Sequence, residues 1–257
     1  MEININCDLG EKSKFHSIKN DPELLNIVNS ANIACGYHAG DEQTMDMVIQ
    51  ISKKNGVSLG AHPSFNDPEN FGRKRMNLNS LEIKKLIFEQ YEILQKIAQK
   101  HNENVTHIKP HGALNNMACE DLELATTLAE AIKDIDKELI YLVPTGSKME
   151  IAAKKLNMKI ACEIFADRNY EDDGSLVLRS KKNALITDPE IAQKHVLKMI
   201  ENQTLNCYSG KQIPCHIDSV CIHGDNESSL NTAKSIKHNL LKNGLKLKSL
   251  NNMKKFL

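Results

Sequence analysis

The sequence lacks an excess of charge of either sign. Its 257 residues include 33 basic and 33 acidic side chains, so the formal net charge is zero. Proteins that bind nucleic acid or an anionic membrane surface usually carry a basic patch or tail, and we expect neither partner here. The sequence also lacks an apolar run long enough to cross a membrane, and it starts MEIN, without the basic and apolar leader of a secreted protein. These absences predict a cytoplasmic protein.

Several motifs that hold metals, disulfides or nucleotides are also absent. The seven cysteines include no C-x-x-C pair and their number is odd, so reduced thiols are the simplest interpretation. There is neither a P-loop nor a G-x-G-x-x-G motif, and any nucleotide would therefore be held by other means. Four cysteines fall inside predicted strands, where a buried core thiol is more common than a nucleophile. They are Cys7, Cys35, Cys162 and Cys221.

Arginine is scarce. Only four of the 33 basic residues are arginines, and all four lie in irregular segments rather than on predicted helices. A guanidinium group is needed where a planar fork must grip a carboxylate or a phosphate, whereas lysine suffices for a solvated charge. We therefore expect at least one arginine to bind an anion, with structural ion pairs as the alternative. The four are Arg73, Arg75, Arg168 and Arg179.

Short apolar segments alternate with amphipathic segments along the whole chain. A hydrophobic content of 40% suits a single globular domain over residues 1–257, and the alternation predicts parallel strands joined by helices. The clearest helical pattern covers 80–101, a hairpin is expected around 209–211, and the lysine-rich tail 244–257 should lie at the periphery. Strands are predicted over 3–7, 31–35, 57–61, 105–109, 139–143, 159–165 and 218–222.

Ionisable residues follow nearly every predicted strand. A seven-stranded parallel (β/α) barrel explains this pattern better than an open sheet, which gathers its site at one switch point. In a barrel the carboxyl ends of the strands meet at one face, and we therefore predict one shared site there. The residues at these strand exits are Asp8 and Glu11, His38 and Asp41, His62, Lys109 and His111, Asp167 and Arg168, and His223 and Asp225.

Two chemistries fit this set of residues. Carboxylates and neutral histidines could hold a divalent metal ion that activates water, with Asp8, His62 and His223 as ligands. Alternatively, the site could work without a metal, with a carboxylate as base, a histidine as proton shuttle and Lys109 facing a developing negative charge. No H-E-x-x-H motif decides between the two.

The motifs, taken together, resemble those of the LamB/YcsF (lactam-utilisation) family. The resemblance covers nearly the whole chain, in order. The matching segments are residues 6–11 (NCDLGE), 31–41 (ANIACGYHAGD), 60–63 (GAHP), 71–76 (FGRKRM), 109–114 (KPHGAL), 165–168 (FADR), 174–179 (GSLVLR) and 221–225 (CIHGD).

The resemblance implies a fold related to the glycoside hydrolase and polysaccharide deacetylase barrels. It also implies ATP-dependent hydrolysis of 5-oxo-L-proline to L-glutamate in a multi-subunit 5-oxoprolinase, with ATP as co-substrate and subunits B and C as partners. We expect B and C to phosphorylate the lactam oxygen and this chain to open the activated ring. Two alternatives stay open, a stand-alone metal-dependent carbohydrate deacetylase or amidase and a non-catalytic subunit that binds 5-oxoproline.

On this resemblance the expected catalytic residues are Asp8, Glu11, Lys109 and His111. Asp8 would activate water, His111 would donate a proton to the ring nitrogen, and Lys109 would contact an anion. Arginine forks suit the carboxylate of the substrate and a phosphoryl group. The expected substrate-binding residues are Asn32, His38, Arg73, Arg168, Arg179 and Asp225.

Overall fold

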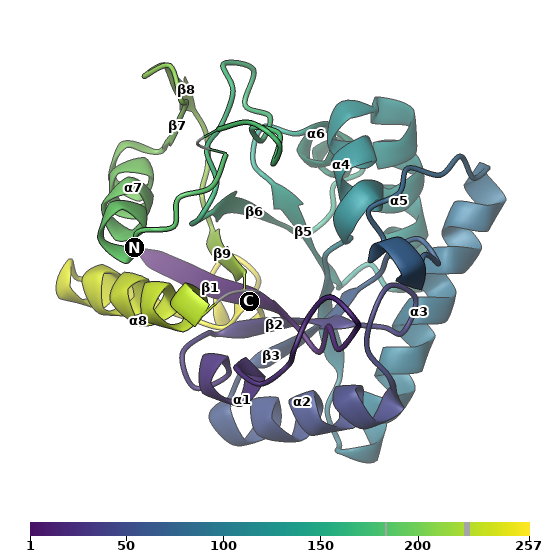
Figure 1. Cartoon of the computed structure of the whole chain (residues 1–257). Coiled ribbons are helices and arrows are strands. Elements are labelled where there is room, and N and C mark those ends of the chain that lie inside the picture. The colour runs from purple at the N-terminus through teal and green to yellow at the C-terminus, as the bar shows by residue number, and fades with distance from the viewer. Residues whose placement is uncertain (183, 224–226) are drawn as a thin grey trace.

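Seven parallel strands close into a barrel among the residues that the computed structural model describes, which are 1–182, 184–223 and 227–257 (Figure 1). The strands pair in the order β1-β2-β3-β4-β5-β6-β9, and β9 pairs with β1 to complete the ring. The predicted seven-stranded (β/α) barrel is confirmed. The strands are β1 (Glu2–Leu9), β2 (Ser30–Ala34), β3 (Ser58–His62), β4 (Val105–Ile108), β5 (Ile140–Pro144), β6 (Ile160–Phe165) and β9 (Ser219–His223).

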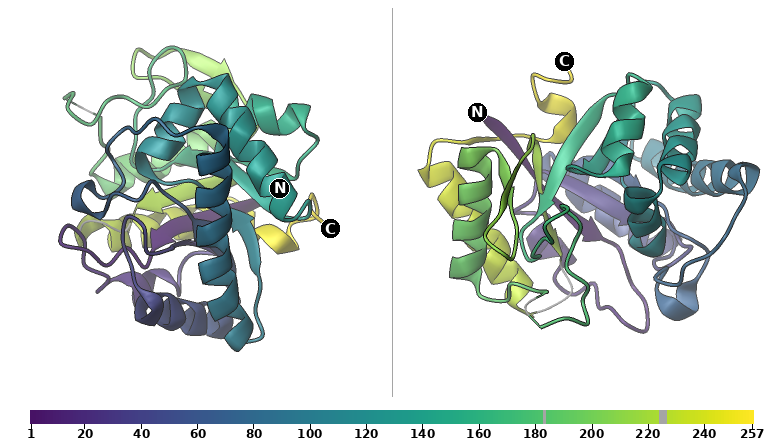
Figure 2. Two further views of the ribbon diagram at one scale, coloured as in Figure 1. Left: turned by 90° about the vertical axis from the view of Figure 1, so that its right-hand side faces the viewer. Right: turned by 90° about the horizontal axis from the view of Figure 1, so that it is seen from above.

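Helices surround the barrel, as the two further views show (Figure 2). The longest described helix, α3, begins with a capping box in which Asn79 and Glu82 satisfy each other's backbone N–H groups. None of the described helices is both long and apolar enough to cross a membrane. The helices are α1 (Asp21–Leu24), α2 (Glu42–Asn55), α3 (Ser80–Lys100), α4 (Gly112–Glu120), α5 (Leu122–Ile135), α6 (Lys148–Lys155), α7 (Pro189–Asn202) and α8 (Glu227–Lys242), with short 3-10 turns η1 (Pro68–Asn70) and η2 (Leu250–Asn252).

Helix α4 was not expected from the sequence. It follows the K-P-H segment directly, begins with a glycine and has no side-chain cap, because His111 at the cap position makes no such hydrogen bond. Glycine is a poor helix former, and without a capping residue the segment gives no start signal. Asp121 ends α4 and caps α5, so the two helices follow each other without a loop.

The interior of the barrel is polar. Side chains alternate along β1, so Ile3 and Ile5 belong to the apolar core under the helices while Asn4 and Asn6 are fully buried on the other face. Asn6 donates to Ser219 Oγ at 2.8 Å. Barrels of this kind are usually filled by branched apolar residues. Here, polar side chains fill the space directly beneath the strand exits.

The segment 244–257 packs against the amino-terminal end of the barrel. Strand β10 (Lys246–Leu247) runs parallel to β1, and the backbone oxygen of Lys248 accepts a hydrogen bond from Asn4 Nδ2 at 2.8 Å. Both chain ends therefore lie at the same end of the molecule (Figure 2). Lysine content gave no sign of this packing, because the buried residues lie between the lysines. The apolar cluster consists of Ile140, Leu142, Ala161, Leu250, Met253 and Phe256.

The predicted hairpin around 209–211 is also present. Strands β7 (Thr204–Asn206) and β8 (Gln212–Pro214) pair in antiparallel fashion outside the barrel.

Candidate active site

The K-P-H-G segment turns the chain at the carboxyl end of β4 and directs two side chains to one place. The N–H of Lys109 donates to Ala61 O at 3.0 Å and that of His111 donates to Pro63 O at 2.8 Å, so the segment follows the neighbouring chain past the end of the strand. Gly112 then takes a φ of +56°, and a Cβ at this position would lie 2.6 Å from a backbone oxygen. Only glycine fits this turn.

Lys109 is the centre of a buried charge cluster inside the barrel. Its ammonium nitrogen lies 2.9 Å from Asp8 Oδ1 and 3.3 Å from Glu163 Oε2. It also donates to Cys221 Sγ at 3.0 Å and to Asn6 Oδ1 at 3.4 Å. Burial is the largest single effect and opposes the charge, but Asp8, Cys221 and Glu163 together outweigh it, and the pKa of Lys109 is raised well above its ordinary value. Lys109 is therefore an ammonium ion at neutral pH.

Glu163 and Cys221 were not among the expected site residues. Both lie within strands that look like apolar core segments, and Cys221 was expected to be a buried core thiol. It is fully buried, but it faces the lysine inside the barrel. Burial raises the pKa of Glu163, against the opposing effect of Lys109. The signal that could have found Glu163 is a lone charged residue in an otherwise apolar strand.

Glu11 joins three histidines at the mouth of the barrel. Its Oε1 lies 3.0 Å from His38 Nε2 and 3.1 Å from His111 Nδ1. His62 Nε2 is 3.8 Å from the same oxygen and 3.4 Å from Asp8 Oδ2, which connects this group to the lysine cluster. Burial opposes the charge of Glu11, but His111 and His38 outweigh it and lower the pKa of Glu11 well below its ordinary value.

His38 lies flat against His111, with ring centroids 3.9 Å apart and an interplanar angle of 9°. Burial, together with the charge of the neighbouring histidine, lowers the pKa of His38 to about 3. His38 is thus neutral at physiological pH and satisfies Glu11 as a hydrogen-bond donor. Atoms of Glu11, His38 and His111 all lie within 4.8 Å of one another, close enough to share a metal ion.

Backbone carbonyl groups fix the proton positions on the other two histidines. His62 Nδ1 lies 2.6 Å from Lys109 O, and His111 Nε2 lies 3.0 Å from Phe71 O. A carbonyl oxygen only accepts, so each of these nitrogens carries the proton. In the neutral rings, the remaining nitrogens, His62 Nε2 and His111 Nδ1, carry lone pairs. These two nitrogens lie 3.0 Å apart.

Asn32 is fully buried and orients Asp8. Its Nδ2 donates to Asp8 Oδ1 at 2.8 Å and to Asn6 Oδ1 at 2.8 Å. Its Oδ1 lies 3.1 Å from His107 Nε2. Asn32 was expected to contact substrate, and the structure places it beneath the carboxylate instead of at the open face.

Three of the four arginines lie in the loops around this site. Arg168 is 7% exposed, and its Nη2 donates to Val177 O at 2.6 Å. Burial, with the positive charge of Arg179 and Arg73 nearby, lowers the pKa of Arg168 below its ordinary value. The guanidinium of Arg73 lies 5.0 Å from the ring centroid of Phe71, which in turn packs against the histidines.

Several other residues that the sequence singled out lie elsewhere or outside the described part. Arg75 pairs with Glu120 on the surface at 2.7 Å. Asp41 caps α2 by accepting from the N–H of Thr44 at 2.8 Å. The backbone of β9 ends at His223, but Asp225 and the side chain of His223 lie outside the described residues.

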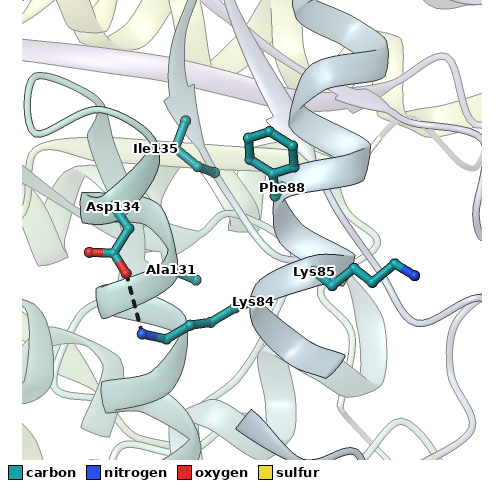
Figure 3. A pocket seen from close by; sticks show the side chains of 6 residues that line it. All are labelled: Lys84, Lys85, Phe88, Ala131, Asp134 and Ile135. Carbon is teal, nitrogen blue, oxygen red and sulfur yellow. Dashed lines mark hydrogen bonds and ion pairs between the residues drawn. The ribbon is translucent and has the colours of Figure 1, made fainter. Parts of the chain in front are cut away.

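A groove on the outer surface is separate from this site. Figure 3 shows it between α3 and α5, where Phe88 and Ile135 supply apolar surface and Lys84 Nζ lies 3.3 Å from Asp134 Oδ2. None of its residues belongs to the strand exits.

Comparisons with known proteins agree with the sequence motifs. The profile of the LamB/YcsF family matches residues 3–255. A protein from Clostridium beijerinckii that is named as the A subunit of 5-oxoprolinase is 44% identical over 239 residues, which are 93% of this chain and 94% of the relative. A protein of the same name from Campylobacter jejuni subsp. doylei is 42% identical over 251 residues, or 98% of each chain.

Solved structures show the same fold. The lactam utilization protein from Thermus thermophilus superposes with a TM-score of 0.90 at 32% identity, covering 97% of this chain and all of that one. The catalytic domain of a peptidoglycan N-acetylglucosamine deacetylase from Eubacterium rectale shares the fold alone, with a TM-score of 0.53 and 13% identity over 98% of this chain and 89% of that one. The chain belongs to the LamB/YcsF family.

Proposed function

We propose that this chain is the component of an ATP-dependent 5-oxoprolinase that opens the ring of 5-oxo-L-proline to give L-glutamate in the cytoplasm. The relatives named as A subunits of 5-oxoprolinase support the substrate and the division into subunits. The observation that carries the chemistry is the buried contact of 2.9 Å between Lys109 and Asp8 at the strand exits. A base and an acid side by side at the strand exits suit hydrolysis of an amide.

An amide carbon reacts slowly with water, so activation is needed. We assign it to subunits B and C, which would use ATP to phosphorylate the lactam oxygen. No nucleotide motif is present in this sequence, which agrees with ATP being bound by a partner. Asp8 would then take a proton from water as the water oxygen bonds to the activated carbon. The C–N bond breaks, and the ring nitrogen must receive a proton. The phosphoryl group then remains on the new carboxyl group as an acyl phosphate, and a second water would release it as inorganic phosphate to leave L-glutamate.

The structure favours Lys109 as the source of that proton. The sequence expectation gave this role to His111, but the N–H at Nε2 of His111 is already hydrogen-bonded to Phe71 O at 3.0 Å. Lys109 is an ammonium ion and lies 2.9 Å from the carboxylate that takes up the first proton. We assign to Glu11, His62 and His111 the shaping of the site around the reacting carbon.

The anionic groups of the substrate need positive partners, and the arginines supply them. Arg168 is buried, and its Nε has no hydrogen-bond partner among the described residues. An unsatisfied buried donor points to a ligand that completes it. We propose that Arg168 binds the carboxylate of 5-oxoproline and that Arg73 and Arg179 face the phosphoryl group. His38 and Asp225 remain proposed substrate contacts.

Reconstitution tests the function. The chain is mixed with separately purified subunits B and C, ATP and 5-oxo-L-proline, and L-glutamate is measured. We expect turnover only when all components are present and loss of at least about 100-fold in the Asp8→Asn and Lys109→Met variants. Near-normal turnover of both variants would reduce the chain to a binding component. Release of acetate from an N-acetyl sugar by the chain alone would instead show a deacetylase.

A further inference from the structure

We propose that Glu11, His62 and His111 bind one divalent metal ion of the zinc type, with a fourth position open toward the mouth of the barrel. The three ligand atoms are Glu11 Oε1, His62 Nε2 and His111 Nδ1. They come from three separate strand exits and meet in a buried place. The sequence expectation named Asp8, His62 and His223 instead, and so shares only His62 with this set.

The first argument is an unmet need for positive charge. When both imidazoles are neutral, His62 Nε2 and His111 Nδ1 present lone pairs to each other at 3.0 Å, and neither can donate. The carboxylate of Glu11 lies 3.1 Å from one and 3.8 Å from the other. Three acceptors that converge without a donor between them repel one another, and a cation among them removes the repulsion.

The second argument is the spacing of the three atoms. Zinc binds imidazole nitrogen and carboxylate oxygen at about 2.0–2.1 Å, and a tetrahedron with such bonds has edges of about 3.3–3.4 Å. The observed separations are 3.0, 3.1 and 3.8 Å, which scatter around that edge. The site is therefore compact enough for one ion.

The third argument is the support behind the ligands. Metal-binding histidines usually donate their other N–H group to a carbonyl or carboxylate, which fixes the ring. Both His62 and His111 do so, to Lys109 O and Phe71 O. His38 Nε2 lies 3.0 Å from Glu11 Oε1 and meets it as an ordinary donor, so His38 supports the site and is not needed as a ligand.

Three protein ligands with one open position are typical of catalytic rather than structural zinc sites. Asp8 Oδ2 lies 3.4 Å from His62 Nε2, so the open position is next to the proposed base. A metal ion there would polarise a substrate oxygen and acidify bound water. This inference rests on the contacts of the described residues and does not depend on the identity of the substrate.

Metal titration tests the proposal without an activity assay. The full-length chain is treated with a chelator, dialysed and titrated with Zn²⁺ by calorimetry and with Co²⁺ by visible absorption. We expect one equivalent to bind and the intense absorption of four-coordinate Co²⁺. Glu11→Gln, His62→Ala and His111→Ala should each weaken binding by about 100-fold or more.

His101 provides a matched control, because its Nε2 also faces a carboxylate, Asp46 Oδ1, at 2.6 Å but on the surface. His101→Ala should leave the titration unchanged. Circular dichroism of each variant separates loss of binding from loss of fold, and Glu11→Gln retains the volume of the side chain. Absence of stoichiometric binding to the wild-type chain, or binding that the three variants leave intact, would overturn the proposal. If no metal binds to the wild-type chain, a proton shared between His62 Nε2 and His111 Nδ1 takes the place of the metal ion.

Discussion

The ammonium nitrogen of Lys109 lies 2.9 Å from Oδ1 of Asp8, although the two residues are 101 positions apart in the chain. The contact spans the inside of the barrel, from the end of β1 to the end of β4. Each buried charge is stabilised by the other, so removing either residue should destabilise the fold. The same contact places a base next to an acid.

The first prediction concerns the stability of this pair. Asp8→Asn leaves the ammonium group with a weaker set of partners, and breaking a buried pair typically costs about 3–5 kcal/mol. Lys109→Met should lower the free energy of unfolding by a similar amount, because it leaves the carboxylate of Asp8 without its ammonium partner. In the Asp8→Asn, Lys109→Met double variant neither charge is left, so its loss should be smaller than the sum of the two. Urea unfolding of all four proteins gives the coupling energy, and additive losses would contradict the pairing.

The second prediction concerns the close approach of β3 and β4. A Cβ added at Gly60 would lie 2.1 Å from His107 Nε2, so Gly60→Ala must displace that ring. We expect a loss of roughly 1–3 kcal/mol, as for other overpacked cores. His107→Ala removes the obstacle, and the double variant should therefore lose less than the two single variants together. Equal thermal midpoints for Gly60→Ala and the wild type would show that the His107 ring can adopt another position without loss of stability.

The third prediction concerns pH. Burial raises the pKa of Asp21 from its ordinary value of 3.8 to about 7, even though its Oδ2 accepts a hydrogen bond from the N–H of Gly10 at 2.8 Å. The folded state thus holds this proton more tightly than the unfolded state. The resulting stabilisation is complete below about pH 4 and is lost as the pH rises through about 7.

An asparagine in place of Asp21 would accept the same hydrogen bond without ionising. Asp21→Asn should therefore match the wild type near pH 4 and be more stable at pH 8, by about 1–4 kcal/mol. Urea midpoints at the two pH values provide the measurement. A wild-type protein that gains stability relative to the variant as the pH rises would show that the carboxylate is better solvated than its burial indicates.

The fourth prediction concerns the end of the chain. Leu250 is fully buried against β5 and β6, whereas Leu257 is 88% exposed. Leu250→Ala should cost about 2–5 kcal/mol, the usual range for a buried leucine, and Leu257→Ala should change nothing measurable. The two leucines form a matched pair in one short segment. Equal effects in thermal unfolding would mean that the packing of Leu250 does not stabilise the barrel.

The architecture could be predicted because it depends on local alternation. Apolar strands, capping residues such as Asp188 and the breaks at Pro110 and Gly112 are all visible within a few residues of sequence. Asp8, Lys109 and His111 could also be predicted, because the carboxyl ends of parallel strands all lie at the same face of a barrel.

The parts that escaped prediction depend on contacts between distant segments. Glu163 looks like an isolated charge in a strand until Lys109 is placed 3.3 Å from it. The proton positions on His62 and His111 are set by carbonyl groups of other loops, which the sequence does not reveal. The packing of Leu250 depends on Ile140, Leu142 and Ala161, which lie far from it in the sequence.

The pairing of β1 has a consequence for the order of folding. One edge of β1 is shared by β10, at Glu2 and Ile3, and β2, from Asn6 to Leu9, and its other edge pairs with β9, from Asn4 to Asp8. During synthesis that second edge waits for more than 200 residues to be made, since β9 begins at Ser219. An unpaired strand edge is a template for association with other chains. Strand β1 is therefore synthesised first, but its pairing is completed only after β9 has been made.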